Sequence, residues 1–312
     1  MGMTVEDLSP LLEHPETEPD VPIVGTFGAH VVRTGRGADG QEYAQVHIFD
    51  STGVAQVFVR KADWGAELRR TPTVCTMAFK FVLGRHGDLV PFGIPATGLI
   101  VGERSSLELL PVHACPDSGD VERLTLLVDS LSTAGFRRFL ENVFSDQSFT
   151  WTFLTQAAGQ RCHHAFPGGL LKHSLEVAEG VQAMMTAMPS NRLMGEAAVL
   201  IGLLHDVGKV ALSQADGYRI PCKQRDHGRL IQYALQKSLV MLKYDDRDAH
   251  DALWRVLHAY QSGEHYDVPL AAVVQAADRA SAQIDAVRKA SGPPGEYWKR
   301  GCGGRRIWDP PG

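Results

Sequence analysis

A histidine and an aspartate, His205 and Asp206, close an apolar stretch of the sequence, AAVLIGLLHDVGKVA at residues 197–211. The apolar run predicts a buried helix, and burying an adjacent imidazole and carboxylate is costly unless each group has a partner. A shared metal ion would be such a partner. A His-Asp dipeptide also occurs by chance on solvated turns, so other ligand-type residues must decide between these two interpretations.

Two further residues of metal-ligand type lie on other segments with helical periodicity. His173 lies in HHAFPGGLLKHSLEVAEGV, and Asp278 lies in the apolar segment VVQAADRASAQID, where an unpaired carboxylate is costly. We therefore predict that His173, His205, Asp206 and Asp278 bind a divalent metal ion. A mixed nitrogen and oxygen set suits Mn²⁺, Fe²⁺, Ni²⁺ or Zn²⁺, and the donor set does not choose among these ions. Mn²⁺ is our first choice, and Mg²⁺ is a further alternative.

Two more histidines, His227 in RDHGRL and His258 in VLHAYQSGEHYD, lie between the doublet and the last aspartate. Two ions about 3.5–4 Å apart can activate water and stabilise a leaving oxygen in phosphoester hydrolysis. We predict that His227 and His258 bind a second ion, and contact with substrate phosphate is the alternative. As helix-terminal or surface histidines they would have neither role.

Four residues are predicted to act on the substrate near the metal. Asp206 and Lys209 are assigned catalytic roles, although Lys209 is equally compatible with a structural ion pair or a phosphate contact. His163 and His164 precede the Pro-Gly-Gly break and are predicted to bind substrate, with a plain loop position as the alternative.

Composition sets the broad class. With 312 residues, 44% hydrophobic and 21% charged, the chain has the make-up of a soluble globular protein with room for two domains. No apolar run approaches about 20 residues, and the acidic start differs from a signal peptide, so we expect a cytoplasmic protein without a membrane contact. Five scattered cysteines without CxxC spacing argue against a disulfide framework or a zinc knuckle. The net charge of −5 argues against nonspecific coating of nucleic acid by the whole surface.

Residues 21–101 are predicted to form a small closed β-barrel after an acidic, disordered tail at residues 1–20. The alternation in EYAQVHIFD predicts a strand with two unlike faces, and DSTG supplies a turn. This part of the chain resembles an OB-fold, notably in YAQVHIFDSTGVAQVFV. The resemblance implies a strand-binding face, for which we predict Tyr43, Phe49, Arg60 and Lys61 as substrate-binding residues. Burial in the barrel core is the alternative for the aromatic residues.

The remainder is predicted to be helical. A Pro- and Gly-punctuated linker at residues 102–119 precedes helical periodicity from 120 to 290, and a flexible Gly- and Pro-rich tail occupies residues 291–312, with a nucleic-acid contact as the minority interpretation. Strands followed by helices indicate an α+β multidomain protein: an OB-like barrel followed by an all-α domain.

The ordered set His173, His205-Asp206 and Asp278 resembles the HD superfamily of metal-dependent phosphohydrolases, over residues 120–290. HHAFPGGLLKHSLEVA is similar to the corresponding segment of two branches, the OB-plus-HD 3′-to-5′ exoribonucleases and the HD-type relaxases of conjugative elements. The barrel fits the first branch, whereas LLPVHACPDSGDVERLTLLVDSLS is more similar to the second. Where the exoribonucleases have His-His-Gly, this chain has His258-Ala259-Tyr260, which weakens the case for a second metal.

We therefore expect a metal-dependent phosphodiesterase that acts on single-stranded RNA or DNA, most simply a 3′-to-5′ exonuclease. A relaxase-like or mobile-element DNA-processing protein, a nucleotide phosphohydrolase and a non-catalytic nucleic-acid-binding protein are the alternatives. The sequence leaves the oligomeric state open.

Overall fold

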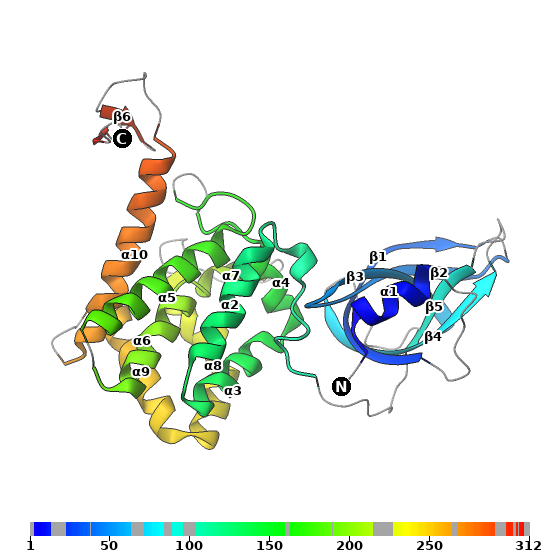
Figure 1. Cartoon of the computed structure of the whole chain (residues 1–312), viewed down its shortest axis with the longest axis horizontal. Coiled ribbons are helices and arrows are strands. Elements are labelled where there is room, and N and C mark those ends of the chain that lie inside the picture. Colours follow the sequence, from blue (N-terminus) through cyan, green and yellow to red (C-terminus); the bar gives the residue numbers. More distant parts are fainter. Residues whose placement is uncertain are drawn as a thin grey trace. The chain divides into compact units, whose positions relative to one another are not determined.

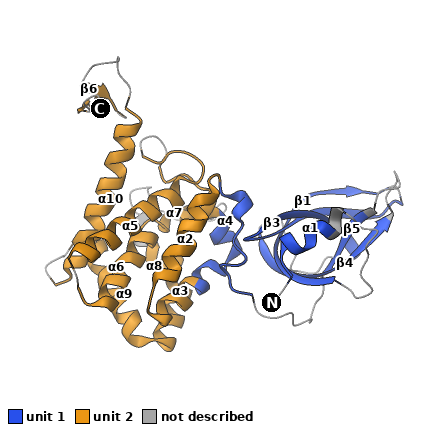
Figure 2. Cartoon of the chain, viewed as in Figure 1, with its two compact units in different colours: residues 1–115, 141–151 blue, residues 116–140, 152–312 orange. Residues whose placement is uncertain are grey.

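The computed structural model divides the chain into two compact units (Figure 2), Met1–Cys115 with Glu141–Trp151, and Pro116–Leu140 with Thr152–Gly312. We call the first the barrel unit and the second the helical unit. The structure describes residues 3–13, 23–37, 39–63, 72–83, 89–95, 104–159, 163–188, 190–214, 227–263, 267–290, 298–301, 304 and 306–308.

The barrel unit contains a closed five-stranded barrel with the strand order β1-β2-β3-β5-β4, which confirms the OB-like prediction (Figure 1). All neighbouring strands are antiparallel except β3 and β5. The strands are β1 (Ile23–Arg36), β2 (Glu42–Asp50), β3 (Gly53–Arg60), β4 (Thr73–Leu83) and β5 (Leu89–Pro95), with a short 3₁₀ helix η2 (Lys61–Asp63) after β3.

Strand β2 has the two unlike faces that its alternation predicts. Ala44, Val46 and Ile48 are completely buried in the barrel core, whereas Tyr43 on the other face is partly exposed. The predicted turn follows, because the Asp50 carboxylate accepts a hydrogen bond of 2.8 Å from the backbone N–H of Thr52.

The prediction that Phe49 lies on the strand-binding face is wrong, because its side chain is completely buried. The rings of His30, His113 and Trp151 lie 5.2–6.1 Å from its ring, centroid to centroid. Gly28 on β1 makes room for it, since a Cβ there would lie 2.1 Å from the Phe49 ring. Residues from distant parts of the chain therefore cover the end of this strand, and Phe49 is not available for stacking with a substrate.

The predicted disordered tail is wrong for helix α1 (Val5–Glu13). Val5 and Leu8 are buried in the barrel core. The backbone N–H of Val5 donates a hydrogen bond of 2.9 Å to the buried carboxylate of Asp50. Burial of two apolar side chains and this bond order a segment whose composition alone favours disorder.

The predicted linker at residues 102–119 is also wrong in part. Arg104 is almost completely buried, with Nη1 at 3.0 Å from Asp50 Oδ2 and 3.0 Å from the carbonyl oxygen of Thr26. The 3₁₀ helix η3 (Val112–Ala114) follows in the same unit, and helix α2 already begins at Ser118. A buried arginine paired with a buried aspartate attaches this connection to the barrel.

The helical unit is built mainly from helices, as predicted. Asp146 caps α4, since its Oδ1 accepts hydrogen bonds from the backbone N–H groups of Ser148 and Phe149. The division between units runs within α3 and α4. The helices are α2 (Ser118–Ser130), α3 (Ala134–Phe144), α4 (Gln147–Thr155), α5 (Gly169–Ala187), α6 (Arg192–Leu204), α7 (Gly208–Gln214), α8 (His227–Asp245), α9 (Arg247–Ser262) and α10 (Pro269–Arg288).

The predicted flexible tail contains a two-stranded antiparallel hairpin of β6 (Trp298–Arg300) and β7 (Arg306–Trp308), so that prediction is wrong for these residues. Among the helices of the described residues, none is long and apolar enough to cross a bilayer.

Candidate metal centre

Helices α5, α6 and α10 pack against one another in the helical unit and carry the predicted ligands (Figure 1). The Pro-Gly-Gly break fixes the start of α5. Gly168 adopts a left-handed backbone with φ of 77°, and a Cβ at Gly169 would lie 2.0 Å from the carbonyl oxygen of His164. His173 follows one turn into α5, His205 caps the C-terminal end of α6, and Asp278 lies in the middle of α10.

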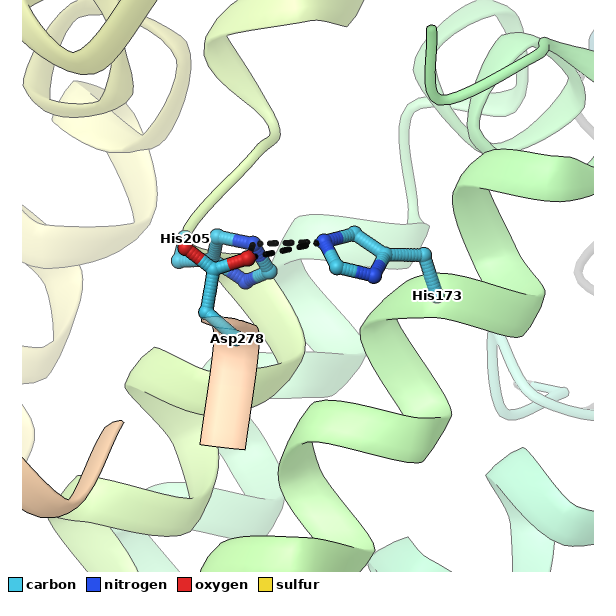
Figure 3. A group of neighbouring side chains, drawn as sticks. All are labelled: His173, His205 and Asp278. Atoms are coloured by element: carbon cyan, nitrogen blue, oxygen red, sulfur yellow. Dashed lines mark hydrogen bonds and ion pairs between the residues drawn. The ribbon is translucent and has the colours of Figure 1, made fainter. Parts of the chain in front are cut away.

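These three helices bring His173, His205 and Asp278 together (Figure 3). One ligand atom from each lies within 4.8 Å of the others. The two Nε2 atoms are 3.2 Å apart, and Asp278 Oδ1 lies 3.2 Å from His173 Nε2 and 3.7 Å from His205 Nε2. Asp206 Oδ2 lies 3.7 Å and 3.6 Å from the same two nitrogens. We call these four residues the ligand cluster.

Hydrogen bonds on the far side of each ring direct a lone pair into the ligand cluster. His205 Nδ1 lies 2.8 Å from the carbonyl oxygen of Gly202, which can only accept, so Nδ1 carries the proton. His173 Nδ1 lies 3.0 Å from Ser281 Oγ, whose own proton is donated to Glu176 over 2.6 Å, so Nδ1 again donates. Both Nε2 atoms are then acceptors that face carboxylate oxygens, and a cation is the group that satisfies such a convergence.

The protonation preferences fit this arrangement. Burial is the main cause that lowers the pKa of His173 below its ordinary value, which favours the neutral imidazole that ligates metals. Burial acts to raise the pKa of Asp278, but the hydrogen bond with His173 and the nearby His205 outweigh it and keep the pKa low. The donor set therefore fits a divalent cation of the classes predicted.

Behind His173 lies a chain of polar groups that we call the positioning network: Ser281, Glu176, His164 and Asp285. Glu176 accepts the Ser281 proton and lies 3.2 Å from His164 Nε2. The backbone N–H of His164 donates a bond of 2.6 Å to Asp285, and His164 has a positive φ of 44°, which is uncommon for a residue other than glycine. Burial opposes the charge on Glu176, but the bonds from His164 and Ser281 lower its pKa to about 2.

Glu176 and Ser281 were not among the predicted site residues. Each stands three residues after a ligand on the same helix, Glu176 after His173 and Ser281 after Asp278, so each lies one turn further on the same helical face. That spacing is the signal that would have identified them. His164 is completely buried and serves this network, which differs from its predicted contact with substrate.

Lys209 and His163 lie closer to open solvent. Lys209 Nζ lies 2.5 Å from Asp206 Oδ2, the oxygen that also faces both Nε2 atoms. The His163 ring lies 5.7 Å from the His173 ring, and burial followed by the charge of Lys209 lowers the pKa of His163. His163 therefore borders the ligand cluster, its contact with substrate stays a prediction, and Lys209 is the ion-pair partner of Asp206.

The predicted pair for a second ion is not brought together in the described residues. His258 is exposed on α9, whereas Tyr260, two residues later, places its hydroxyl 3.5 Å from Asp278 Oδ2 and its ring 6.0 Å from that of His205. Burial and the nearby Asp278 raise the pKa of Tyr260 well above its ordinary value. His227 begins α8, but its side chain lies outside the described residues.

In the barrel unit, three of the four predicted strand-binding residues lie near one another. Tyr43 and Lys61 line a hollow of about 350 Å³ at the N-terminal end of β2, and Arg60 is the partner of Tyr43 across the sheet. The Tyr43 ring also packs edge-on against Phe92 at 5.6 Å, and Phe92 contacts Phe58 at 6.1 Å. These partly exposed rings form an outer aromatic row that sequence analysis assigned only in part.

Comparison with known proteins identifies one domain. Residues 170–283 match the family model described as the HD domain, and this range includes all four residues of the ligand cluster. No curated protein and no solved structure matches the chain. HD domains bind divalent metals, so the match confirms the predicted resemblance at the level of the superfamily and supports a metal-dependent phosphohydrolase.

Proposed function

We propose that this chain, with its HD domain at residues 170–283, is a metal-dependent phosphodiesterase that degrades single-stranded nucleic acid in the 3′-to-5′ direction. The observation that carries the proposal is the convergence of four acceptor groups, His173, His205, Asp206 and Asp278, in the helical unit. Mn²⁺ is the ion we expect there.

The four residues of the ligand cluster would hold the ion, which when bound supplies activation of water and polarisation of a phosphoryl oxygen. The protein's own groups prepare the site. Gly202 and Ser281 keep the proton of each imidazole on Nδ1, and Lys209 keeps positive charge beside Asp206. His163 borders the cluster, where a neutral imidazole can hydrogen-bond a phosphate ester.

The barrel supports a polymeric substrate. A closed OB-like barrel with an outer row of Tyr43, Phe58 and Phe92 beside Arg60 and Lys61 combines surfaces for base stacking with positive charge for phosphate. A nucleotide phosphohydrolase would have no need of such a row, which is why we place the strand-cleaving activity first.

A single ion would use all four residues of the ligand cluster. The predicted second ion depends on His227, whose side chain lies outside those residues, and on His258, which is exposed and away from the cluster. We therefore propose a mononuclear centre with Tyr260 beside it, and the dinuclear alternative remains a prediction.

The test is turnover of a single-stranded oligonucleotide labelled at its 5′ end, with Mn²⁺ added after chelation, compared with a panel of mononucleotides. We expect a ladder that shortens from the 3′ end, and loss of at least roughly a thousandfold in rate in Asp206→Ala. Asp251→Ala, which removes an exposed aspartate of the same unit, is the matched control.

Turnover of mononucleotides alone would replace the proposal with a nucleotide phosphohydrolase. A folded Asp206→Ala protein that cleaves like the wild type would exclude the metal centre as the site of catalysis.

A further inference from the structure

The C-terminal hairpin has a charge opposite to that of the whole chain. From Trp298 to Trp308 the sequence WKRGCGGRRIW contains four basic residues and no acidic residue, whereas the chain carries a net charge of −5. The segment contains no residue of the ligand cluster or of the barrel strands, and it follows α10 in the helical unit (Figure 1).

One face of the hairpin collects its aromatic and basic side chains. Trp298 pairs directly with Trp308, and Arg300 pairs directly with Arg306. Directly opposed residues point to the same side of a sheet, and so do residues two apart along a strand, so all four share one face. The two indoles are 49% and 59% exposed, and both arginines are exposed. We call this the Trp-Arg face.

Within the hairpin itself, the Trp-Arg face has unbalanced positive charge and exposed aromatic surface. Like charges directly opposite each other weaken a strand pair, and Arg300 faces Arg306. In the described part of the chain neither arginine forms an ion pair, and the Arg306 guanidinium instead lies 4.9 Å from the centre of the Trp298 ring. An anionic partner would remove the repulsion, and a planar partner would cover the indoles.

We propose that the Trp-Arg face binds single-stranded nucleic acid, with bases stacked on Trp298 and Trp308 and phosphates between Arg300 and Arg306. The two pairs are two residues apart, about 7 Å along the strand, so one face can engage a base and a neighbouring phosphate. This goes beyond the proposed hydrolysis, because the binding requires neither the metal nor the barrel.

The arrangement of these side chains favours nucleic acid over a lipid surface. Surface-bound amphipathic segments separate an apolar face from a charged one. Here the guanidiniums lie on the same face as the indoles, and the one aliphatic residue of the strands, Ile307, points to the other side. Mixed aromatic and cationic groups match a polymer in which bases and phosphates alternate.

The experiment measures binding by the full chain in excess chelator, so that no strand is cleaved. Fluorescence anisotropy of labelled oligothymidylate and oligouridylate gives Kd at several salt concentrations and separates DNA from RNA. We expect Trp298→Ala/Trp308→Ala to weaken binding about tenfold or more, since stacking contributes strongly per base. Arg300→Gln/Arg306→Gln should weaken binding and flatten the slope of log K against log salt by about 1.4, which corresponds to two phosphate contacts.

The matched control is Trp254→Ala/Arg247→Gln, which removes an exposed tryptophan and an exposed arginine from α9 and should bind like the wild type. Tyr43→Ala tests the contribution of the barrel to oligonucleotide binding separately, and the rate of hydrolysis with Mn²⁺ tests the proposed function separately. Wild-type Kd and salt slope in both hairpin variants would overturn the proposal. So would hairpin variants that lose binding to phosphatidylserine vesicles while keeping their affinity for both oligonucleotides.

Discussion

Each unit gathers several histidines, and the two groups behave differently. In the barrel unit, His30, His47 and His113 lie around Phe49 and Trp151, with ring centroids 5.0–5.6 Å apart for the closest pairs. We call these five residues the histidine–aromatic cluster. Among the described residues, His30 Nδ1 and both nitrogens of His113 are buried without a hydrogen-bond partner. These imidazoles fill space among aromatic rings.

In the helical unit the imidazoles of His173 and His205 each have two defined neighbours. One ring nitrogen is held by Ser281 or by the carbonyl oxygen of Gly202, and the other faces carboxylates. The number of histidines in a group therefore does not by itself indicate a metal site. Carboxylates on one side of the ring and a hydrogen-bond acceptor on the other side make one.

The two groups of histidines should differ most in the metal that their removal costs. His205→Ala removes a ligand from the cluster, so we expect bound Mn²⁺ to fall from about one per chain to a level near zero and hydrolysis to fall by at least roughly a thousandfold. His113→Ala, which removes an imidazole of the histidine–aromatic cluster, should keep the wild-type metal content. Elemental analysis of both purified variants gives the ratios, and metal loss in His113→Ala would show that the distinction is wrong.

The ligand cluster was open to prediction for a physical reason. A histidine and an aspartate at the end of an apolar helix, and an aspartate in another apolar segment, are expensive without a partner, and that cost is visible in the sequence. The barrel was open to prediction because residues 43–48 alternate with a period of two. Both signals are local.

What could not be predicted depends on contacts between distant segments. Phe49 continues the alternation of β2 but is covered by His113 and Trp151 from elsewhere in the chain. Helix α1 has the composition of a tail and is ordered by burial in the barrel core. The positioning network joins three separate parts of the sequence, so only its spacing along each helix was visible beforehand.

The positioning network should set metal affinity through the Ser281 hydroxyl. Ser281→Ala removes the acceptor of the His173 proton, so the ring can turn or change tautomer and metal affinity should fall about 10- to 100-fold. Ser281→Thr keeps a hydroxyl and should restore most of the affinity. Calorimetric titration of the metal-free protein with Mn²⁺ measures the Kd.

The chain offers a matched control for this substitution. Ser174 is a buried serine next to His173 in the sequence, and its hydroxyl has no partner among the described residues. Ser174→Ala should therefore leave the Kd for Mn²⁺ unchanged. Equal losses in Ser174→Ala and Ser281→Ala would mean that general packing, and not the bond to His173, sets the metal affinity.

Acid should act on the barrel unit through the histidine–aromatic cluster. Burial lowers the pKa of His113 to about 4, and burial also lowers the pKa values of His30 and His47. In the unfolded chain these groups bind protons near pH 6.5, so between about pH 4 and pH 6.5 the unfolded state holds more protons than the folded state. Their contribution to stability is fully present above about pH 6.5 and is lost as the pH falls towards 4.

Thermal unfolding at about pH 7.5 and about pH 5 measures this effect. His113→Phe keeps a ring but cannot be protonated. Between the two pH values its free energy of unfolding should therefore fall by roughly 1 kcal/mol less than that of the wild type, a difference of about 2–4 °C in Tm. His258→Phe removes an exposed histidine and serves as the control. An identical pH dependence in His113→Phe and the wild type would show that the cluster does not resist protonation.

Substitution of His258 and of Tyr260 tests which side of α9 faces the ligand cluster. Successive residues of a helix are rotated by about 100°, so His258 and Tyr260 point in nearly opposite directions. Tyr260 is the one that reaches Asp278 and His205, and His258 is exposed. We therefore expect His258→Ala to change metal content and kcat/KM by less than about twofold, and Tyr260→Phe to lower kcat/KM several-fold because Asp278 loses a donor. Loss of bound Mn²⁺ in His258→Ala would restore the dinuclear interpretation, because removal of an exposed histidine that binds no ion should leave the metal-to-protein ratio unchanged.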